Sequence, residues 1–522
     1  MIREISRRKC LRLWMCKPEY MGRTKWENRF VLLRFRKKNY MMFLKDLKRF
    51  KMERLYDKLK AYSESDFYAF HMPGHKRNKA LLGIELPYDL DITEIDGFDD
   101  LHHADGILKE EQERAARVFG AEESHFLVNG STAGILSAVM GCTHRGDKIL
   151  VARHCHKSIY HAIYMNGLVP RYVYPEFDIS MHMNGEISKE DVAKALAAEP
   201  DIKAVVIVSP NYDGVVSDVK GIAEVAHSYR IPLIVDEAHG PHFGFHPAFP
   251  GRANDLGADV VINSLHKTLP SLTQTAILHI NGKIVNRRRI KKYLDMLQSS
   301  SPSYIFMASL DACVDFVDGK CENAFELYVE RLQKFREELE PLQHLQILRT
   351  EHYDISKVVI STANANITSP ELADRLRKEY HLEMEMTGGT YVLAMTTVAD
   401  TQEGLDRLKA ALLEIDGQLE AKTAVSGSIE ISGELPRLEQ YFTPQEAADR
   451  EEDGEAEEIP WKESEGHISL EYAYLYPPGS PVIVPGERIS REAVELLRYY
   501  ETQNLQIEGI QTEGKIKVWK HE

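Results

Sequence analysis

Cysteine is scarce in this chain of 522 residues: there are six, and no two of them are spaced as a CxxC pair. Zinc ribbons and thioredoxin-like redox sites depend on such pairs, so the sequence supports neither, and we expect no metal site. So few cysteines in so long a chain are typical of reduced cytosolic thiols, because disulfide frameworks belong to short secreted proteins. We therefore predict a cytoplasmic protein.

Long apolar runs and a surplus of positive charge are also lacking. No segment reaches the ~18 consecutive apolar residues of a membrane span, and the net charge is −15. An acidic protein has no electrostatic attraction to nucleic acid or to an anionic membrane, so we predict neither as a partner. A cationic small molecule, in contrast, would not be repelled.

Residues 1–52 depart from this acidic balance, with 17 Lys and Arg against 4 Asp and Glu. A mitochondrial transit peptide has this charge, and so has a basic arm that packs on an acidic surface. We favour a third interpretation, a poorly ordered basic extension that precedes a natural start at Met42 or Met52. Basic residues interrupt every apolar run here, so a secretory signal is not indicated.

From about residue 124, short apolar runs alternate with helical stretches. The strand-like runs are Ser124–Val128, Lys148–Ala152, Ala204–Ser209, Pro232–Asp236, Asp259–Ser264 and Thr275–Ile280. The amphipathic segments between them include Ala133–Gly141, Ser188–Ala198 and Gly221–Tyr229. The second has Asp191 three residues after Ser188, which resembles a capping box with Asp in place of Glu and predicts Ser188 as the helix cap. This alternation predicts an α/β fold with a mostly parallel sheet covered on both faces. Such sheets bind ligands beyond the carboxyl ends of their strands.

The texture of the sequence changes twice after this region. We predict a large domain over residues 53–320 and a small α/β domain over 321–445, which begins with the helical pattern Phe325–Leu339. Residues 446–466 are so acidic and so poor in apolar side chains that we expect a solvated linker there. Apolar content returns in 467–522, which we predict to be a C-terminal domain.

Two charged residues follow neighbouring apolar runs. Asp236 ends the run Pro232–Asp236, where a buried carboxylate is costly unless it is paired. Lys267 follows the run Asp259–Ser264, where its amine could form an imine with a carbonyl cofactor. Pyridoxal phosphate would supply the partner of Asp236, because its protonated ring nitrogen needs a facing anion to act as an electron sink. Taken singly, Asp236 also suits a helix or turn cap, and Lys267 a solvated loop.

A third element, VNGSTAG at Val128–Gly134, joins a strand to a helix. Its residues Gly130, Ser131 and Thr132 offer backbone N–H groups and hydroxyls at a helix N-terminus, which together form a phosphate cradle. The pattern is not a GxxxxGK[ST] loop, so a nucleotide triphosphatase is not indicated. His156, after the next strand, could stack on a flat cofactor ring. An ordinary helix cap and a structural histidine are the alternatives, but four such elements on successive strand ends favour a pyridoxal-phosphate site.

With these motifs the chain resembles the Orn/Lys/Arg decarboxylase family of fold-type I pyridoxal-phosphate enzymes, and within it the short bacterial arginine/lysine decarboxylase branch. The resemblance implies a fold-type I large domain with a mostly parallel sheet, a small α/β domain and a C-terminal domain. At LHHADG, Ala104 stands where proline is usual. The matching stretches are FHMPGHK (Phe70–Lys76), DITEIDGFDDLHHADG (Asp91–Gly106), NGSTAG, HCHKS (His154–Ser158), SPNYDGVVSD (Ser209–Asp218), VDEAHG, SLHKTL (Ser264–Leu269), SSSPSY (Ser299–Tyr304) and YPPGSPVIVPGE (Tyr476–Glu487).

The resemblance implies a role for each residue around the cofactor ring. Lys267 would be the Schiff-base lysine, Asp236 would pair with the pyridine nitrogen, and His156 would stack on the ring. Ala238 would pack under the ring, and His239 would lie close to its edge. Lys267, Asp236 and His156 are thus the expected catalytic residues.

The phosphate site and the substrate site are also implied by the resemblance. A hydroxyl of Ser300 or Ser301 from a neighbouring subunit would reach the phosphate, which predicts a homodimer, or a dimer-based oligomer, with shared active sites. The other residues expected around the phosphate are Gly130, Ser131, Thr132, Ser264 and His266. The candidates for contacts with the substrate, whose distal cation must meet an acid, are His75, Glu94, Asp96, Asp99, Asp100 and Glu487.

The implied reaction is decarboxylation of a basic L-amino acid, with arginine and its product agmatine favoured over lysine and ornithine. An aminotransferase of the same fold is the main alternative, but that class usually fixes the substrate carboxylate with an arginine in the small domain. The stretch Leu382–Thr397 contains no arginine. An inactive regulatory paralogue is the other alternative, and it should have lost Lys267 or Asp236, both of which are present.

Overall fold

The structure is a computed structural model that describes residues 54–520, except 82, 179–182, 350, 423–434, 476–478 and 504. The predicted basic extension at residues 1–52 and the first residues of the YPPGSPVIVPGE motif therefore lie outside the described residues. Within the described part of the chain, no helix combines the length and the apolar character needed to cross a membrane.

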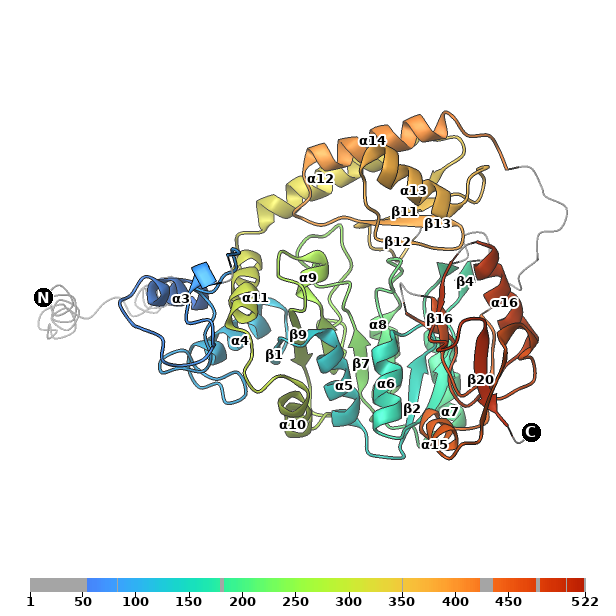
Figure 1. Cartoon of the computed structure of the whole chain (residues 1–522), viewed down its shortest axis with the longest axis horizontal. Helices are drawn as coiled ribbons and strands as arrows, with labels where there is room; N and C mark the ends of the chain where they lie inside the picture. The colour runs from blue at the N-terminus through green and yellow to red at the C-terminus, as the bar shows by residue number, and fades with distance from the viewer. Residues whose placement is uncertain are drawn as a thin grey trace, which may run out of the picture. The chain divides into compact units, whose positions relative to one another are not determined.

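A seven-stranded sheet forms the centre of the fold (Figure 1). The strands from β8 to β3 are parallel, whereas β9 runs antiparallel to both of its neighbours, so the predicted mostly parallel sheet is confirmed. The six predicted strands agree with the observed ones to within one residue at each end. Only β3 was missed, because VPRYV breaks the apolar run with a proline and an arginine. In spatial order the strands are β1 (Glu123–Leu127), β9 (Ala276–Ile280), β8 (Val260–Asn263), β7 (Leu233–Asp236), β6 (Val205–Val208), β2 (Lys148–Ala152) and β3 (Val169–Val173).

Both faces of this sheet are buried under helices. Alternate residues of a strand point to opposite faces, and in β1 Phe126 and Leu127 belong to two different apolar clusters. One cluster includes side chains of α5, α6, α7 and α8, and the other those of α4 and α11. Ser188 caps α7 by accepting a hydrogen bond from the backbone N–H of Asp191, as its sequence position predicted. The helices of this region are α4 (Ile107–Val118), α5 (Gly130–Cys142), α6 (Lys157–Met165), α7 (Lys189–Ala198), α8 (Val219–Ser228), α9 (Leu265–Thr268), α10 (Arg287–Leu297) and α11 (Tyr304–Val317).

A second, antiparallel sheet of four strands lies within the range predicted for the small domain. Helix α13 begins with a full capping box, in which the side chains of Thr368 and Glu371 bind each other's backbone N–H groups. The sheet runs in the order β10 (Gln346–Ile347), β11 (Lys357–Ser361), β13 (Tyr391–Met395) and β12 (Met386–Thr387). Its helices are α12 (Glu322–Glu338), α13 (Ser369–Tyr380) and α14 (Gln402–Asp416).

The acidic segment 446–466 is not the solvated linker that its composition indicated. It forms most of α15 (Pro444–Glu452) and all of β15 (Ala456–Pro460), which pairs with β20 (Lys515–Trp519) over five residues. Composition was misleading because a few apolar residues anchor the segment: Ala447 and Trp461 are buried, and Ile459 is partly buried. One acidic residue of β15, Glu458, lies directly opposite the basic Lys517 in register, whereas Glu457 lies opposite Val518.

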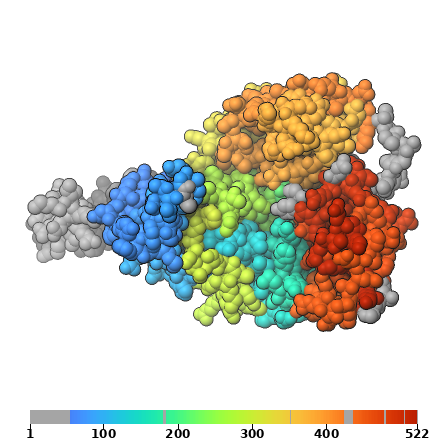
Figure 2. All heavy atoms as spheres, in the orientation of Figure 1, coloured from blue at the N-terminus to red at the C-terminus, as the bar shows by residue number. Residues whose placement is uncertain are grey.

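Three small sheets make up the C-terminal part of the chain. Arg153, after β2, donates two hydrogen bonds to the carboxylate of Glu487, at 2.9 and 2.8 Å, and one to the carbonyl of Val482. This buried pair holds the C-terminal part of the chain against the large domain. Figure 2 shows the atoms of the C-terminal part in direct contact with those of the large domain. The remaining elements are β14 (Glu439–Gln440), β16 (Ala473–Leu475), β17 (Pro481–Ile483), β18 (Glu487–Arg488), β19 (Ile507–Glu508) and α16 (Arg491–Thr502).

Candidate active site

Asp236 and Lys267 lie at the same edge of the large sheet. Strand β7 ends at Asp236, and Lys267 follows the parallel neighbour β8 in the short helix α9. Asp236 is only 3% exposed, and this burial raises the pKa of its carboxyl, while the charge of Lys267 acts in the opposite direction. Burial lowers the pKa of Lys267, which favours the neutral, nucleophilic amine. The edge therefore presents a buried acid and an amine of lowered basicity together.

The loop after β1 brings the predicted phosphate cradle to this same edge. Gly130 has a φ of +72°, a conformation that favours glycine, and it begins helix α5. The hydroxyls of Ser131 and Ser264 are hydrogen-bonded to each other, which joins the loop after β1 to the loop after β8. Thr132 is exposed in the first turn of α5. Hydroxyls at a helix N-terminus, with open space around Gly130, suit a phosphate group.

His156 and His266 lie near Lys267, whose charge lowers the pKa of both rings. His156 caps α6, where its Nδ1 accepts a hydrogen bond from the N–H of Ser158 at 3.2 Å. Burial and the charge of Lys267 lower the pKa of His156 to about 4, so its ring is neutral and suited to stacking. Nδ1 of His266 lies 2.8 Å from the carbonyl oxygen of Thr275, a hydrogen bond that fixes the histidine beside β9.

His239 lies between two lysines. Its Nε2 is 2.9 Å from Nζ of Lys267, and its Nδ1 is 2.8 Å from Nζ of Lys357, the first residue of β11 in the small sheet. The ring of Tyr212 packs on His239 with centroids 4.5 Å apart, and the Tyr212 hydroxyl donates to the exposed carboxylate of Glu385. The sequence predicted His239 and Lys267 near the cofactor but did not indicate Lys357, Tyr212 or Glu385. The available signal was a lysine at the start of the buried run KVVIS.

A second contact between the two sheets runs parallel to this one. His242 lies between Asp354 and Thr268, with ring nitrogens 3.1 Å from Oδ1 of Asp354 and 3.0 Å from the Thr268 hydroxyl. Thr268 is the neighbour of Lys267 on α9. Ala238, which is 5% exposed, lies in the same turn after β7, and its N–H donates to Asp236. The turn from Asp236 to His242 therefore fixes both the acid and the lysine helix.

Two of the tentative substrate residues are engaged elsewhere. Glu487 is fully buried against Arg153, and Asp99 accepts hydrogen bonds from the N–H groups of Gly106 and Leu108 at the start of α4. Both carboxylates therefore stabilise the fold, and their assignment to the substrate stays a prediction. The sequence could not reveal this, because the partner of Glu487 lies 334 positions away.

The other candidates, His75, Glu94, Asp96 and Asp100, lie in the segment between helix α3 (Leu55–Ser63) and α4. His75 is 3.2 Å from Asp91 and stacks on Tyr88, whereas Oε1 of Glu94 is buried without a hydrogen-bond partner among the described residues. The loop with the exposed Ser300 and Ser301 lies beside the cradle, because Ser299 donates its N–H to Asn129 at 3.1 Å.

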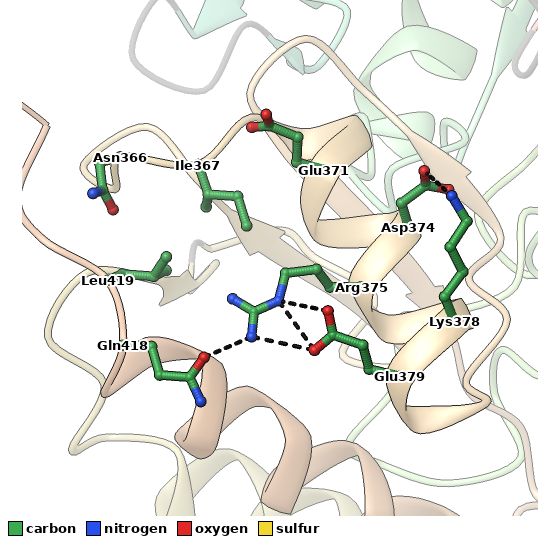
Figure 3. A pocket seen from close by; sticks show the side chains of 9 residues that line it. All are labelled: Asn366, Ile367, Glu371, Asp374, Arg375, Lys378, Glu379, Gln418 and Leu419. Atoms are coloured by element: carbon green, nitrogen blue, oxygen red, sulfur yellow. Dashed lines mark hydrogen bonds and ion pairs between the residues drawn. The ribbon is translucent and has the colours of Figure 1, made fainter.

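A surface pocket of about 510 Å³ lies apart from these residues, between α13 and the end of α14 (Figure 3). Its central cation, Arg375, is already bound to Glu379 and to Gln418. None of the residues that line this pocket belongs to the cluster around Lys267, so we do not take it as the active site.

Comparison with known proteins agrees with this geometry. The sequence model of "Orn/Lys/Arg decarboxylase, major domain" matches residues 53–421, and that of the family's C-terminal domain matches 433–514. The arginine decarboxylase of Bacillus subtilis (strain 168) is 33% identical over a gapped alignment of 471 positions, which covers 87% of this chain and 95% of the relative. The constitutive lysine decarboxylase of Escherichia coli K12 is 24% identical over a gapped alignment of 548 positions, which covers 84% of this chain and 75% of the relative.

Solved structures give the same fold. The E. coli constitutive lysine decarboxylase superposes with a TM-score of 0.76 at 20% identity, covering 96% of this chain and 86% of that one. Lysine decarboxylase A of Pseudomonas aeruginosa has a TM-score of 0.75 at 23% identity and covers 92% and 81%. The resemblance of the motifs is confirmed over nearly the whole described chain, and the chain belongs to the Orn/Lys/Arg decarboxylase family of pyridoxal-phosphate-dependent amino-acid decarboxylases.

Proposed function

We propose that this chain converts arginine to agmatine and CO2, with pyridoxal phosphate bound covalently to Lys267. The observation that carries the proposal is the meeting of Asp236, Lys267 and the N-terminus of α5 at one edge of the sheet. A buried acid, an amine of lowered pKa and an anion cradle are the three partners that this cofactor needs.

The cofactor would be held by residues that are already in place. Ser131, Thr132, Ser264 and the first N–H groups of α5 would bind the phosphate, because hydroxyls and a helix N-terminus favour a dianion. Asp236 would face the ring nitrogen, and the neutral ring of His156 would lie on the ring face. When bound, pyridoxal phosphate supplies an electron sink for the charge that remains on Cα as CO2 leaves.

The protein's own task is to orient the substrate and to manage one proton. A bond breaks readily only when it stands perpendicular to the cofactor ring, so the groups that fix the substrate select decarboxylation. Replacing the carboxylate by hydrogen consumes one proton per turnover. Lys267 and His239 are the groups of this chain that can hold that proton near the cofactor.

Arginine is favoured as the substrate because the relatives that cover nearly the full chain at about 32–33% identity are named arginine decarboxylases. The distal guanidinium needs an acid. Glu385 is well placed for this, because it accepts from Tyr212 and its charge acts on both Lys267 and Lys357. Its partly open position would let a long cation approach from solvent.

A homodimer is part of the proposal. The segment of residues 67–84 exposes several large apolar side chains, including Phe70 at 90% and Leu81 at 73%. Such a set is unusual on a monomer in water and suits an interface between two copies. Ser300 and Ser301 are exposed beside the cradle and could then complete the phosphate site of the second copy.

The direct test has two readouts. Pure enzyme is incubated separately with arginine, lysine and ornithine, and the amine formed is identified; agmatine is expected as the main product. Borohydride reduction followed by peptide mapping should then find the cofactor on Lys267. An adduct on another lysine would overturn the site, and cadaverine or putrescine as the main product would overturn the substrate.

A further inference from the structure

The hydrogen bonds of His239 restrict the protonation of the two lysines that contact it. A neutral imidazole has one N–H donor and one lone pair, and an ammonium group can only donate. Burial lowers the pKa of His239 well below its usual value, and the positive charges of Lys267 and Lys357 act in the same direction, so the ring is neutral. Contacts of 2.9 and 2.8 Å to two ammonium groups would leave one N–H facing another donor. Both contacts can be hydrogen bonds only if one lysine is neutral.

The surroundings of the two lysines indicate which one keeps the charge. Burial lowers the pKa of Lys357, which is 1% exposed, and the charge of Lys267 acts in the same direction. Three carboxylates oppose this and favour its charged form, those of Asp354, Glu385 and Asp213. For Lys267 the first of its two carboxylates is Asp236. On the proposed function, Asp236 is committed to the ring nitrogen of the cofactor and Glu385 to the substrate, whereas Asp354 and Asp213 remain beside Lys357.

We propose that Lys357 is a positioning residue that keeps the amine of Lys267 neutral through His239. The ammonium of Lys357 donates to Nδ1 of His239, which places the ring proton on Nε2, and this N–H donates to the lone pair of Lys267. The arrangement fixes the histidine tautomer and keeps Lys267 as a neutral amine, whose lone pair becomes available to a carbonyl group when the hydrogen bond from Nε2 of His239 breaks.

The same chain can deliver a proton. Lys357 transfers one proton to Nδ1 of His239, while Nε2 transfers its own to Nζ of Lys267. The result is a neutral Lys357, a neutral His239 of the other tautomer and a charged Lys267, so the charge balances and only protons move. Burial lowers the pKa of Lys357 to about 8, close enough to neutrality for the group to give up and regain a proton.

The groups that face Lys357 set the pH dependence of this chain. Besides His239 and Lys267, they are Tyr212, whose ring centroid is 5.8 Å from Nζ, together with Asp213, Tyr353, Asp354 and Glu385. His242 does not compete for Lys357, because its two ring nitrogens face Asp354 and Thr268.

The first test follows imine formation in the full chain from which the cofactor has been removed. The rate at which added pyridoxal phosphate becomes borohydride-reducible on Lys267 is measured against pH. Because a neighbouring positive charge lowers the pKa of an amine, Lys357→Met should raise the midpoint by about one pH unit and slow the reaction about tenfold near neutrality. Lys357→Arg keeps a charged donor and should stay near the wild-type midpoint.

Lys378→Met is the matched control, because Lys378 is an exposed lysine of the same region that pairs with Asp374. Its midpoint should equal that of the wild type. The proposal is overturned if Lys357→Met also leaves the midpoint unchanged, or if Lys357→Arg shifts it as far as the methionine variant does.

A second measurement needs neither a stable variant of Lys357 nor cofactor chemistry. Nitrogen NMR of the histidine-labelled wild-type chain, with His239→Gln used for assignment, should show a neutral ring protonated at Nε2. A ring protonated at Nδ1, or a charged ring, would contradict the proposal even if decarboxylation is established. If instead no imine forms on Lys267 in the wild type, the proposed function fails, while the tautomer still tests the role of Lys357.

Discussion

Arg153 and Glu487 form a two-hydrogen-bond ion pair that is sealed from solvent between the large sheet and the C-terminal part of the chain. Removing one partner leaves a buried charge uncompensated, so Glu487→Ala should lower the free energy of unfolding by about 3–5 kcal/mol. Glu495→Ala, which breaks an exposed pair with Arg491, should cost less than about 1 kcal/mol. Chemical denaturation of both variants measures the difference. Equal losses would show that the buried pair has no special structural role.

Asp236→Asn separates ring electronics from cofactor binding. The cradle and Lys267 remain, so the protein should keep its yellow cofactor, but the carboxylate that faces the ring nitrogen is gone. Electrostatic stabilisation of a developing charge contributes several kcal/mol, so turnover should fall about a thousandfold or more, with a much smaller change in KM. Steady-state kinetics with arginine is the measurement. Turnover close to the wild-type value would remove Asp236 from the ring nitrogen.

Glu385→Gln tests the acid proposed for the distal cation. Loss of one charge-assisted hydrogen bond at a partly exposed site should raise KM for arginine about tenfold, with kcat changed less. Glu383→Gln, a change at an exposed glutamate two residues away, is the control and should leave KM unaltered. If both variants keep the wild-type KM, the guanidinium binds elsewhere. Glu94, whose Oε1 has no hydrogen-bond partner among the described residues, then becomes the next residue to change.

Glu237, beside Asp236, should make stability depend on pH. Burial raises the pKa of its carboxyl to about 8. In the unfolded chain this pKa is about 4.3, so between these values the native state holds one more proton and is stabilised less as the pH rises. The free energy of unfolding of Glu237→Gln should therefore rise relative to that of the wild type, by at most about 1.4 kcal/mol per pH unit across this range. Thermal unfolding from pH 5 to 8 measures the gain. A constant difference between the two proteins would mean that Glu237 is ionised in the fold.

The homodimer is tested by light scattering on the full chain. A mass of twice 59.6 kDa is expected. Phe70→Glu replaces an aromatic ring that is 90% exposed by a charged group and should weaken the dimer. Tyr229→Glu is the control, because this ring is 37% exposed and lies outside the segment of residues 67–84, and it should leave the dimer intact. A fully active monomer would contradict both the dimer and a phosphate contact from Ser300 or Ser301.

The sequence predicted what depends on neighbours along the chain. Strand ends, the cap at Ser188 and the positions of Asp236 and Lys267 follow from local patterns, because a buried strand and the residue after it are read directly. The contact of Lys357 with His239 joins two sheets across 118 positions and depends on how they pack. The acidic strand β15 was missed for the same reason, since its stability comes from β20 at the far end of the chain.

The reversed direction of β9 determines how tightly the lysine segment is tethered. Because β9 runs antiparallel to β8, the chain leaves β8 and enters β9 at the same end of the sheet. Lys267 therefore lies in a short connection whose two ends are both held by strands. Near the start of β9, the backbone carbonyl of Gln274 accepts the N–H of Gly130, and its side-chain amide donates to the carbonyl of Val128. These two hydrogen bonds also attach the connection to the loop after β1. The position of the Lys267 amine is therefore closely restricted. Inserting a single residue into the segment 268–274 would displace this amine and would also loosen the phosphate cradle.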